Sequence, residues 1–435
     1  MTSKFIDHAP EVQRAIVIHP DGRGASARLA EERLEEAVGL SAALDLDVRA
    51  AEVARLRRTV PATLFGMGKV DEIAALIRAA EADVVVIDDA LTPVQQRNLE
   101  KAWEVKVIDR SGLILEIFGR RARTAEGRLQ VELARLDYER SRLVRTWTHL
   151  ERQRGGTGST GGPGETQIEL DRRMIADRID KLKAELEDVR RTRALHRKAR
   201  KRVPFPSVAL VGYTNAGKST LFNRLTGSEV LAKDLLFATL DTTQRTIRLP
   251  QGRPAIIADT VGFISDLPHE LVAAFRATLE EVGEADLILH VRDIASTDTE
   301  AQRRDVEQVL EQIPVPEGRT RRVLEVWNKI DLLSDEDREA VLGQAARQLQ
   351  EGKAVAVSAW TGEGIETLRE AIAAQIDDEP ETRLTLDAGQ GEALAWLYEH
   401  GRVTFRDTDA EGRVHLIVKL PPAALGRFEQ RFGLD

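Results

Sequence analysis

Cysteine is absent from the 435-residue chain. This excludes disulfides, iron–sulfur clusters and thiolate zinc sites, so we expect a cytoplasmic location. No apolar run approaches the roughly 20 residues that a membrane-spanning helix needs, and residues 1–10 lack a signal-peptide core. The 15 prolines are too few for a collagen. A globular chain remains, long enough for about two to four domains.

Charge is distributed unevenly along the chain. The formal net charge is −9, which on its own argues against a nucleic-acid partner. Residues 119–202, however, contain 23 Lys and Arg against 13 Asp and Glu, a local net charge of +10 that leaves −19 for the rest. One basic segment therefore lies between acidic neighbours.

Hydrophobic patterning divides the chain into four regions: 1–118, 119–203, 204–377 and 378–435. In the first and third, short apolar runs alternate with helical patterns, which predicts two α/β domains with parallel sheets. The last region reads strand, helix, strand, strand, helix and predicts a small α+β module. The expected strands of the first three regions are residues 15–18, 48–53, 83–87, 105–108, 207–211, 255–258, 287–291, 323–327 and 354–357. The helices expected in the first region are residues 26–38, 70–80 and 93–103.

The basic region, 119–203, has a heptad pattern in two halves. The seam residues are Leu129, Leu133, Leu136, Leu143, Trp147 and Leu150, with Arg140 at one seam position, and then Ile175, Ile179, Leu182, Leu186 and Val189. The glycine-rich stretch Gly155–Gly164 between the halves is not expected to be helical. We predict an antiparallel coiled-coil hairpin with a first helix over Glu126–Arg154, projecting roughly 40 Å, and no second chain is needed to cover its seam.

A phosphate-binding motif follows the predicted strand 207–211. Gly212-Tyr-Thr-Asn-Ala-Gly217-Lys218-Ser219 has the spacing of a P-loop, in which backbone N–H groups and the lysine bind phosphates and the serine hydroxyl ligates Mg²⁺. Asp259-Thr-Val-Gly262 follows the strand 255–258, where a carboxylate can hold Mg²⁺ through water and the glycine N–H can contact a γ-phosphate. Either motif alone is also compatible with an ordinary turn or helix cap.

Two segments with base-recognition motifs follow the predicted strands 323–327 and 354–357, one after each strand. In Asn328-Lys329-Ile330-Asp331 the aspartate can accept both the N1–H and the N2–H₂ of guanine, a donor pair that adenine lacks. Ser358-Ala359 can offer a backbone N–H to guanine O6. All four motifs lie at the carboxyl ends of predicted parallel strands, where a doubly wound fold binds nucleotides.

With these motifs the chain resembles the translational GTPases and, more narrowly, the HflX family of ribosome-associated GTPases. The narrower resemblance rests on Phe237-Ala-Thr-Leu-Asp241, on Asp259 to His269 and on the stretch Glu151 to Gln167 in the hairpin. It implies a Mg²⁺-dependent GTPase that converts GTP to GDP and binds the large ribosomal subunit through ribosomal RNA. It also implies action on stalled or idle ribosomes under stress, including their splitting into subunits.

The resemblance also assigns residue roles. Thr239 becomes the first-switch threonine that ligates Mg²⁺ with Ser219; composition alone leaves Thr242 and Thr243 as equal candidates. Lys218, Thr239 and Gly262 are the expected catalytic groups. The expected nucleotide site comprises Gly212, Tyr213, Thr214, Asn215, Ala216, Gly217, Lys218, Ser219, Thr220, Phe237, Ala238, Thr239, Leu240, Asp241, Asp259, Thr260, Val261, Gly262, Asn328, Lys329, Ile330, Asp331, Ser358 and Ala359.

Phe263 stands where a water-orienting glutamine would follow the Asp259–Gly262 motif. A phenyl ring cannot accept a hydrogen bond from the attacking water, so we expect slow hydrolysis by the isolated protein and stimulation by a partner. A core role for the ring is compatible with that expectation.

The hairpin tip is the expected RNA contact, through Arg152, Arg154, Arg172 and Arg173. The alternative is that these charges are only the solvated face of a heptad helix, and that the chain is a GTP-gated switch for a protein partner. Gly66-Met-Gly68-Lys69 hints at a second phosphate site but favours a turn into the next helix. We expect a monomer, and no histidine shows metal-ligand spacing.

Overall fold

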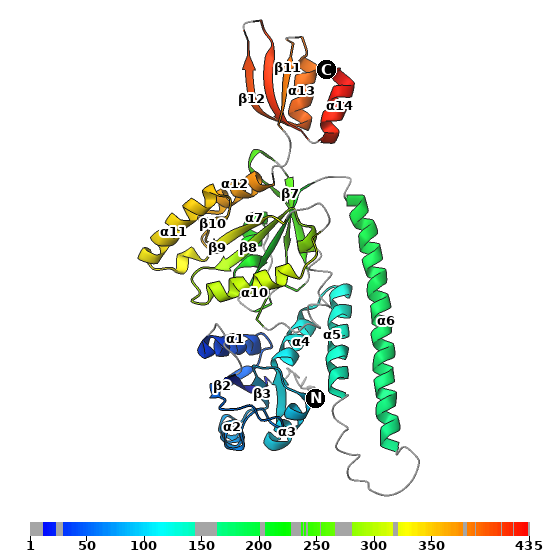
Figure 1. Ribbon diagram of the computed structural model, residues 1–435, viewed down its shortest axis with the longest axis vertical. Helices are drawn as coiled ribbons and strands as arrows, with labels where there is room; N and C mark the ends of the chain where they lie inside the picture. Colours follow the sequence, from blue (N-terminus) through cyan, green and yellow to red (C-terminus); the bar gives the residue numbers. More distant parts are fainter. Residues whose placement is uncertain are drawn as a thin grey trace, which may run out of the picture. The chain divides into compact units, whose positions relative to one another are not determined.

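The computed structural model describes residues 12–22, 29–143, 163–200, 205–227, 236–237, 239–240, 242–252, 254–265, 281–315, 321–376, 381–387, 389–409, 411–420 and 422–433. The chain forms two compact units, Met1–Ile372 and Ala373–Asp435. The predicted multidomain α/β class is confirmed by both (Figure 1). Among the described residues no helix has the length and apolarity to cross a membrane.

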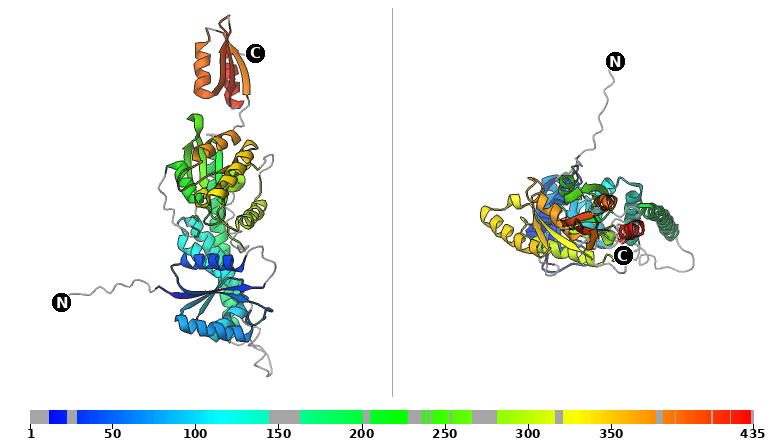
Figure 2. Two further views of the ribbon diagram at one scale, coloured as in Figure 1. Left: turned by 90° about the vertical axis from the view of Figure 1, so that its left-hand side faces the viewer. Right: turned by 90° about the horizontal axis from the view of Figure 1, so that it is seen from above.

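The N-terminal α/β region (β1 to α4) is a parallel sheet with the strand order β2-β1-β3-β4. Its helices cover both faces of the sheet, as Figure 2 shows. Its strands are β1 (Arg14–Asp21), β2 (Asp47–Arg55), β3 (Val84–Ile87) and β4 (Lys106–Asp109), and its helices are α1 (Ala30–Ala42), α2 (Met67–Ala80), α3 (Pro93–Trp103) and α4 (Arg110–Arg121).

The strands and helices predicted for this region are present, but some of them begin or end at other residues than predicted. The first helix begins at Ala30 rather than residue 26, and the predicted boundary at residue 118 lies inside α4. The glycines near residue 66 lead directly into α2, whose Lys69 pairs with Glu52 at 2.5 Å and with Glu72 at 3.0 Å. Lys69 is therefore engaged by carboxylates, which favours the predicted turn over a phosphate site.

Two long helices follow, α5 (Ala125–Leu143) and α6 (Pro163–Arg200), and they pack against each other as a helical hairpin (Figure 1). The predicted seam of α6 is confirmed at its centre, where Ile179, Leu182 and Leu186 are buried. Glu132 and Arg178 join the two helices at 2.6 Å. The rest of the expected first helix, with Trp147 and Leu150, lies outside the described residues.

Three predictions for the hairpin need correction. Pro163 and Gly164 are helical, because proline is favoured in the first turn, where its missing N–H costs no hydrogen bond. Arg140 is exposed and pairs with Asp137 at 2.8 Å instead of filling the seam. The first helix does not project freely, since Val131 and Ala134 bury a second face of α5 in a core shared with α4.

The following region has a six-stranded sheet with the order β10-β9-β8-β5-β7-β6. The predicted strands are confirmed as β5 (Ser207–Gly212), β7 (Pro254–Asp259), β8 (Leu287–Asp293), β9 (Val323–Asn328) and β10 (Ala354–Ala356), all parallel. The antiparallel edge strand β6 (Thr243–Arg248) was not predicted. The helices are α7 (Lys218–Thr226), α10 (Thr299–Glu311), α11 (Asp335–Gln350) and α12 (Ile365–Gln375), with 3₁₀ turns at Pro250–Gly252 and Ile330–Leu332.

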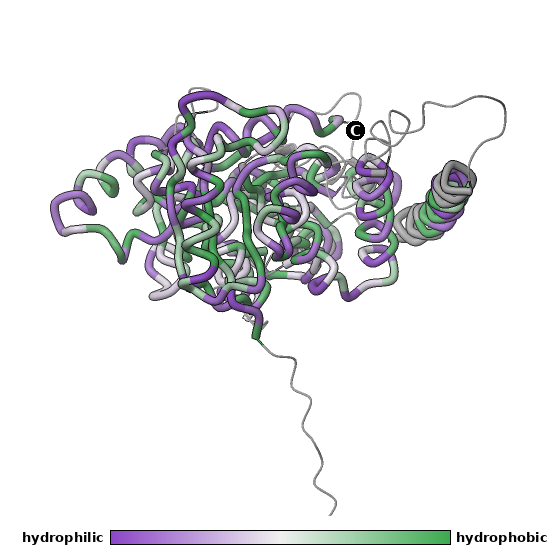
Figure 3. The backbone as a smooth tube through the Cα atoms, turned by 90° about the horizontal axis from the view of Figure 1, so that it is seen from below, coloured by the Kyte–Doolittle hydropathy of each residue, from purple (hydrophilic) through white to green (hydrophobic). Residues whose placement is uncertain are grey.

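One hydrophobic core connects the N-terminal region to the six-stranded sheet. It joins Val17 and Ile114 from the first region to Val211, Phe263 and Ile288 from the second. Figure 3 shows hydrophobic residues concentrated along the inner strands, with hydrophilic stretches on the outer helices. The two regions thus share buried apolar surface, which favours their fixed association.

The second unit has the predicted order of elements. Its strands β11 (Glu381–Leu386), β12 (Arg402–Thr408) and β13 (Val414–Lys419) form an antiparallel sheet with the order β11-β13-β12. Helices α13 (Gly391–His400) and α14 (Pro422–Phe432) bury Trp396, Leu397 and Phe428 in its core.

Packing within the hairpin predicts a local loss of stability. Leu182 is fully buried, so Leu182→Ala should destabilise the α5–α6 contact by about 2–5 kcal/mol through lost burial and a cavity. Amide hydrogen exchange over residues 175–189 measures the effect. Lys183→Ala, at an exposed neighbour, is the matched control and should leave protection unchanged. Equal protection in both variants would contradict the packing described.

Candidate nucleotide site

The phosphate-binding loop connects the end of β5 to the first turn of α7. Gly212 has a φ of 154°, and a Cβ there would lie 2.2 Å from the carbonyl oxygen of Val291. Gly217 has a φ of 91°, and a Cβ there would lie 2.2 Å from Nδ2 of Asn328. Both positions therefore require glycine for two reasons: the backbone has a positive φ, and an atom of a neighbouring strand residue occupies the place of a Cβ.

Lys218 is buried at the first position of α7, and its Nζ donates to the carbonyl oxygen of Tyr213 at 2.6 Å. Burial lowers the pKa of Lys218 to about 8, an effect that the nearby Asp259 carboxylate partly offsets. A Cβ on Gly262 would lie 3.0 Å from this Nζ. The lysine of the first motif and the glycine of the second are thus neighbours, as binding one terminal phosphate requires.

The two predicted Mg²⁺ ligands, Ser219 and Thr239, meet Asp259, which is predicted to hold the ion through water. The hydroxyls of Ser219 and Thr239 each lie 2.8 Å from Oδ2 of Asp259 and 2.8 Å from each other. Thr243, one of the two alternatives to Thr239, begins the edge strand β6. Oδ1 of Asp259 is buried without a hydrogen-bond partner among the described residues, and burial raises the pKa of this carboxyl. An oxygen-only donor set with an unsatisfied carboxylate oxygen fits Mg²⁺.

Asn328 organises the other side of the loop. Its Nδ2 donates to the carbonyl oxygen of Ala216 at 2.8 Å, and its Oδ1 accepts from the N–H of Ala359 at 2.9 Å. Lys329 has a φ of 70° and pairs with Asp293 at 2.7 Å. The predicted base-binding segments are therefore tied to the phosphate loop by one amide, and the exposed Asp331 follows in the 3₁₀ turn.

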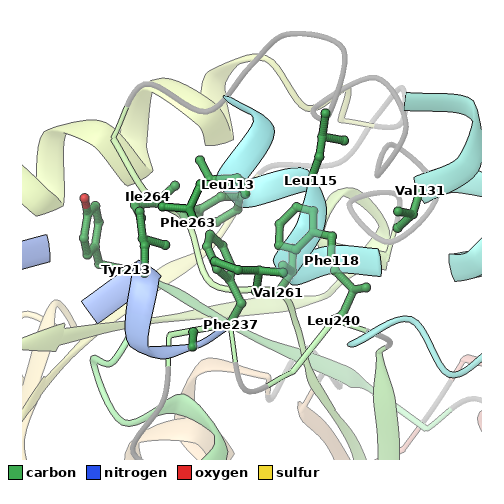
Figure 4. Close-up of a cluster of buried hydrophobic side chains, with 14 of the residues drawn as sticks. Leu113, Leu115, Phe118, Val131, Tyr213, Phe237, Leu240, Val261, Phe263 and Ile264 are labelled. Carbon is green, nitrogen blue, oxygen red and sulfur yellow. The ribbon is translucent and has the colours of Figure 1, made fainter. Parts of the chain in front are cut away.

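Several predicted site residues contribute to the core rather than pointing side chains at a ligand. The ring of Phe237 packs edge-on against Phe118 of α4, with centroids 4.7 Å apart. Figure 4 shows this pair together with Phe263, which is only 1% exposed. Leu240, Val261 and Ile330 are also buried apolar residues, and the hydroxyl of Thr260 donates to the carbonyl oxygen of Leu210 at 2.6 Å.

The remaining predictions fall partly outside the described residues. Asn215 is exposed in the loop with a φ of 59°, Thr220 is half-buried, and Ser358 is buried with its Oγ accepting from the N–H of Thr361 at 3.0 Å. Ala238 and Asp241 are not among the described residues. At the hairpin, Arg172 and Arg173 are exposed near the start of α6, whereas Arg152 and Arg154 lie outside the described residues.

The N-terminal region adds acidic residues that the sequence motifs did not indicate. Glu32, Glu35 and Glu36 of α1 line a cavity of about 380 Å³ together with Tyr213, Thr214 and Asn215 of the phosphate loop. Oγ1 of Thr214 is buried there without a hydrogen-bond partner among the described residues. No motif could have identified these glutamates, because their place beside the loop depends on packing between distant segments.

Family models match almost all of the chain. Residues 31–119 match "GTP-binding GTPase N-terminal", residues 121–200 match "GTP-binding GTPase Middle Region", residues 207–329 match "50S ribosome-binding GTPase" and residues 343–435 match "HflX C-terminal domain".

Individual proteins match over similar lengths. The chain is 50% identical to "GTPase HflX" of Magnetococcus marinus over 97% of this chain and 96% of that protein. It is 46% identical to "GTPase HflX" of Escherichia coli over 83% of each chain. A solved GTP-binding protein from Sulfolobus solfataricus in complex with GDP is similar with a TM-score of 0.45 and 24% identity, covering 84% of this chain and 99% of the other.

The position of Asp331 predicts the base preference. In Asp331→Asn the side chain would offer an N–H₂ where guanine offers N1–H and N2–H₂, so affinity for GDP should fall roughly 100-fold or more. Xanthosine diphosphate carries an oxygen in place of N2 and should bind better to the variant than to the native chain. Nucleotide titrations measure both, with Asp335→Asn at the exposed start of α11 as the control. Unchanged GDP affinity would contradict the assignment.

Proposed function

Because the chain belongs to the HflX family of GTPases, we propose that it is a Mg²⁺-dependent switch that binds the large ribosomal subunit. We further propose that it acts on stalled or idle ribosomes, including their splitting into subunits, and that it works in the cytoplasm as a monomer. The observation that carries the proposal is the convergence of Ser219, Thr239 and Asp259 at one point, in a chain that also has a basic helical hairpin.

GTP hydrolysis itself follows from the family, and this chain's residues supply binding and positioning. Backbone N–H groups of the phosphate loop and Lys218 would hold the phosphates, and Asp331 would select guanine. Bound Mg²⁺, held by Ser219 and Thr239 and through water by Asp259, would neutralise charge on the phosphates. Thr239 would contact Mg²⁺, and Gly262 would contact the γ-phosphate, only in the GTP form. The segments that contain these two residues would therefore act as switches.

The burial of Phe263 supports slow hydrolysis without a partner. Its ring is in the core, its carbonyl oxygen accepts from the N–H of Thr214 at 2.7 Å, and its N–H donates to the carbonyl oxygen of Gly212 at 3.1 Å. These contacts hold the backbone of the second switch against the phosphate loop. The phenyl ring carries no oxygen that could orient the attacking water. A bound partner would therefore supply a water-orienting group, or would order one that the chain already has.

The hairpin supports an RNA partner. Residues 119–202 carry a net charge of +10, and Arg172 and Arg173 are exposed on the end of α6 that follows the glycine-rich stretch. Binding of lysine and arginine to phosphates releases counterions, so the affinity should fall steeply with salt. Ile179, Leu182 and Leu186 of the seam are buried and so are not available for contact with RNA.

Hydrolysis in the presence of ribosomes tests the proposed function. Purified large ribosomal subunits should stimulate steady-state GTP hydrolysis by the full chain by about 10²-fold or more, since partner activation of GTPases reaches on the order of 10⁵-fold. Raising the salt concentration should reduce the stimulation. Rapid turnover without subunits, approaching about 1 s⁻¹, would contradict the role given to Phe263. Tight GTP binding without any stimulation would favour a protein partner instead.

The arginines around the hairpin tip can be tested separately. Changing Arg152, Arg154, Arg172 and Arg173 to glutamate should abolish binding to the large subunit, because four cations at the expected RNA contact become anions. Affinity for GDP should stay the same, since these residues are remote from the nucleotide motifs in sequence. Glutamates at Lys181 and Lys183, exposed further along α6, are the matched control. Undiminished binding of the tip variant to the large subunit would contradict the proposal that the tip contacts RNA.

A further inference from the structure

A buried arginine of the N-terminal region holds the beginning of the second switch. Arg110, the first residue of α4, is 3% exposed. Its Nη2 donates to both the carbonyl oxygen and the Oγ of Ser265 at 3.0 Å, and it also pairs with Glu36. Its Nη1 lies 2.5 Å from Oδ1 of Asp88. One guanidinium thus joins two carboxylates of its own region to a residue 155 positions away.

Ser265 follows Gly262 by three residues and is held from several sides. Its backbone N–H donates to the hydroxyl of Tyr213 at 2.8 Å, and its Oγ donates to Glu36 at 3.2 Å. The Tyr213 hydroxyl in turn donates to Glu36. A displacement of Gly262 toward or away from a γ-phosphate would therefore be transmitted to the contacts that Arg110 and Glu36 make.

The residue before Arg110 holds the hairpin. Asp109 ends β4, and its Oδ1 accepts from the Tyr138 hydroxyl at 2.6 Å while its Oδ2 accepts from Nη2 of Arg142 at 2.6 Å. The Arg142 guanidinium lies 4.0 Å from the centroid of the Tyr138 ring. Asp109 also accepts from the N–H of Gly112 at 2.8 Å and so caps α4. These contacts attach the far end of α5 to the junction between β4 and α4, where Asp109 is followed by Arg110.

Helix α4 contacts both switches and the hairpin. Arg110 at its start binds Ser265, and Phe118 further along packs on Phe237 in the first switch. The same helix packs against α5, whose Val131 belongs to the shared core (Figure 4). A short rigid element with partners in three segments can transmit a displacement, because packed interfaces change between discrete arrangements rather than deforming continuously.

We propose that Asp109 and Arg110 are positioning residues that link the second switch to the hairpin, so that the bound nucleotide sets the position of α5 and α6. Arg110 acts through Ser265 on the segment that begins at Gly262, and Asp109 acts through Tyr138 and Arg142 on α5. The inference rests on the proposed function only for what the hairpin tip contacts. The linkage itself is a property of the isolated chain.

The absence of cysteine allows a direct test. Lys101→Cys on α3 and Lys183→Cys on α6, both at exposed positions, introduce the only two thiols for spin labels in the full chain. The distance between the labels is measured with GDP and with a non-hydrolysable GTP analogue, each with Mg²⁺. We expect two resolved distance distributions with different means.

Variants on the hairpin side test the route. Tyr138→Phe combined with Arg142→Gln removes both contacts to Asp109 and leaves the nucleotide site untouched. This pair should abolish the shift between the two distributions while GDP affinity remains native. Arg140→Gln, which removes an exposed arginine of the same helix that pairs with Asp137 within that helix, is the matched control and should retain the shift.

A variant on the switch side tests the guanidinium. Arg110→Lys keeps a positive charge beside Asp88 and Glu36, but one ammonium group cannot replace the forked contacts to Ser265. The shift should again be lost. If Arg110→Lys does not fold, the variants of Tyr138 and Arg142 still decide the question.

The results separate this inference from the proposed function. Identical distributions with GDP and the GTP analogue in the otherwise native chain would overturn the inference, as would a shift that survives in Tyr138→Phe with Arg142→Gln. A shift that these variants abolish would support it even if large ribosomal subunits failed to bind. In that case the proposed ribosomal role would be contradicted, and the proposed link between the second switch and the hairpin would still be supported.

Discussion

The buried guanidinium of Arg110 is the interaction on which the arrangement of the first unit depends. Burial acts to lower the pKa of Arg110, but Asp88 and Glu36 outweigh it and raise the pKa. Burial would likewise raise the pKa of Asp88, yet Arg110 and His19 bring it to about 2. Removing one partner of such a pair typically costs about 3–5 kcal/mol, because the other charge stays buried. The same guanidinium binds Ser265, so the network that stabilises the N-terminal region also fixes the second switch.

The nucleotide site has a comparable organiser in Asn328. Its amide connects the phosphate loop at Ala216 to the segment at Ala359, so that the parts that would bind phosphate and base are held at a fixed separation. Phe263 holds the second switch to the same loop through its backbone. Each switch therefore has one end in the nucleotide site and the other in the core shared with the N-terminal region.

The sequence predicted the parts of the fold that depend on local pattern. The strand–loop–helix context of Lys218 and the strand before Asp259 are continuous in sequence, and the structure confirms both strands as β5 and β7. Strand β6 (Thr243–Arg248) was missed because it is a largely polar, exposed edge with one buried residue, Ile247. The second buried face of α5 was missed because the heptad seam alone accounted for its leucines.

Contacts between remote segments were beyond the sequence patterns. Glu36 and Ser265 are 229 positions apart, and nothing in either neighbourhood indicates the other. Phe237 was assigned to the nucleotide site because it belongs to a motif, whereas its ring packs on Phe118 in the core. The role of Thr239 in holding Mg²⁺ stays a prediction that the family resemblance implies; in the structure its hydroxyl lies 2.8 Å from Oδ2 of Asp259.

Coupling between the nucleotide site and the proposed ribosome-binding surface is tested most directly by thermodynamic linkage. Affinities for GDP and for a non-hydrolysable GTP analogue should be measured with and without saturating large ribosomal subunits. We predict that subunits tighten binding of the analogue more than binding of GDP. Dividing the factor by which subunits tighten binding of the analogue by the factor for GDP gives a ratio. By reciprocity, this ratio must equal the factor by which the subunit binds more tightly to the analogue-bound chain than to the GDP-bound chain. Subunits that bind but change both nucleotide affinities equally would contradict this coupling.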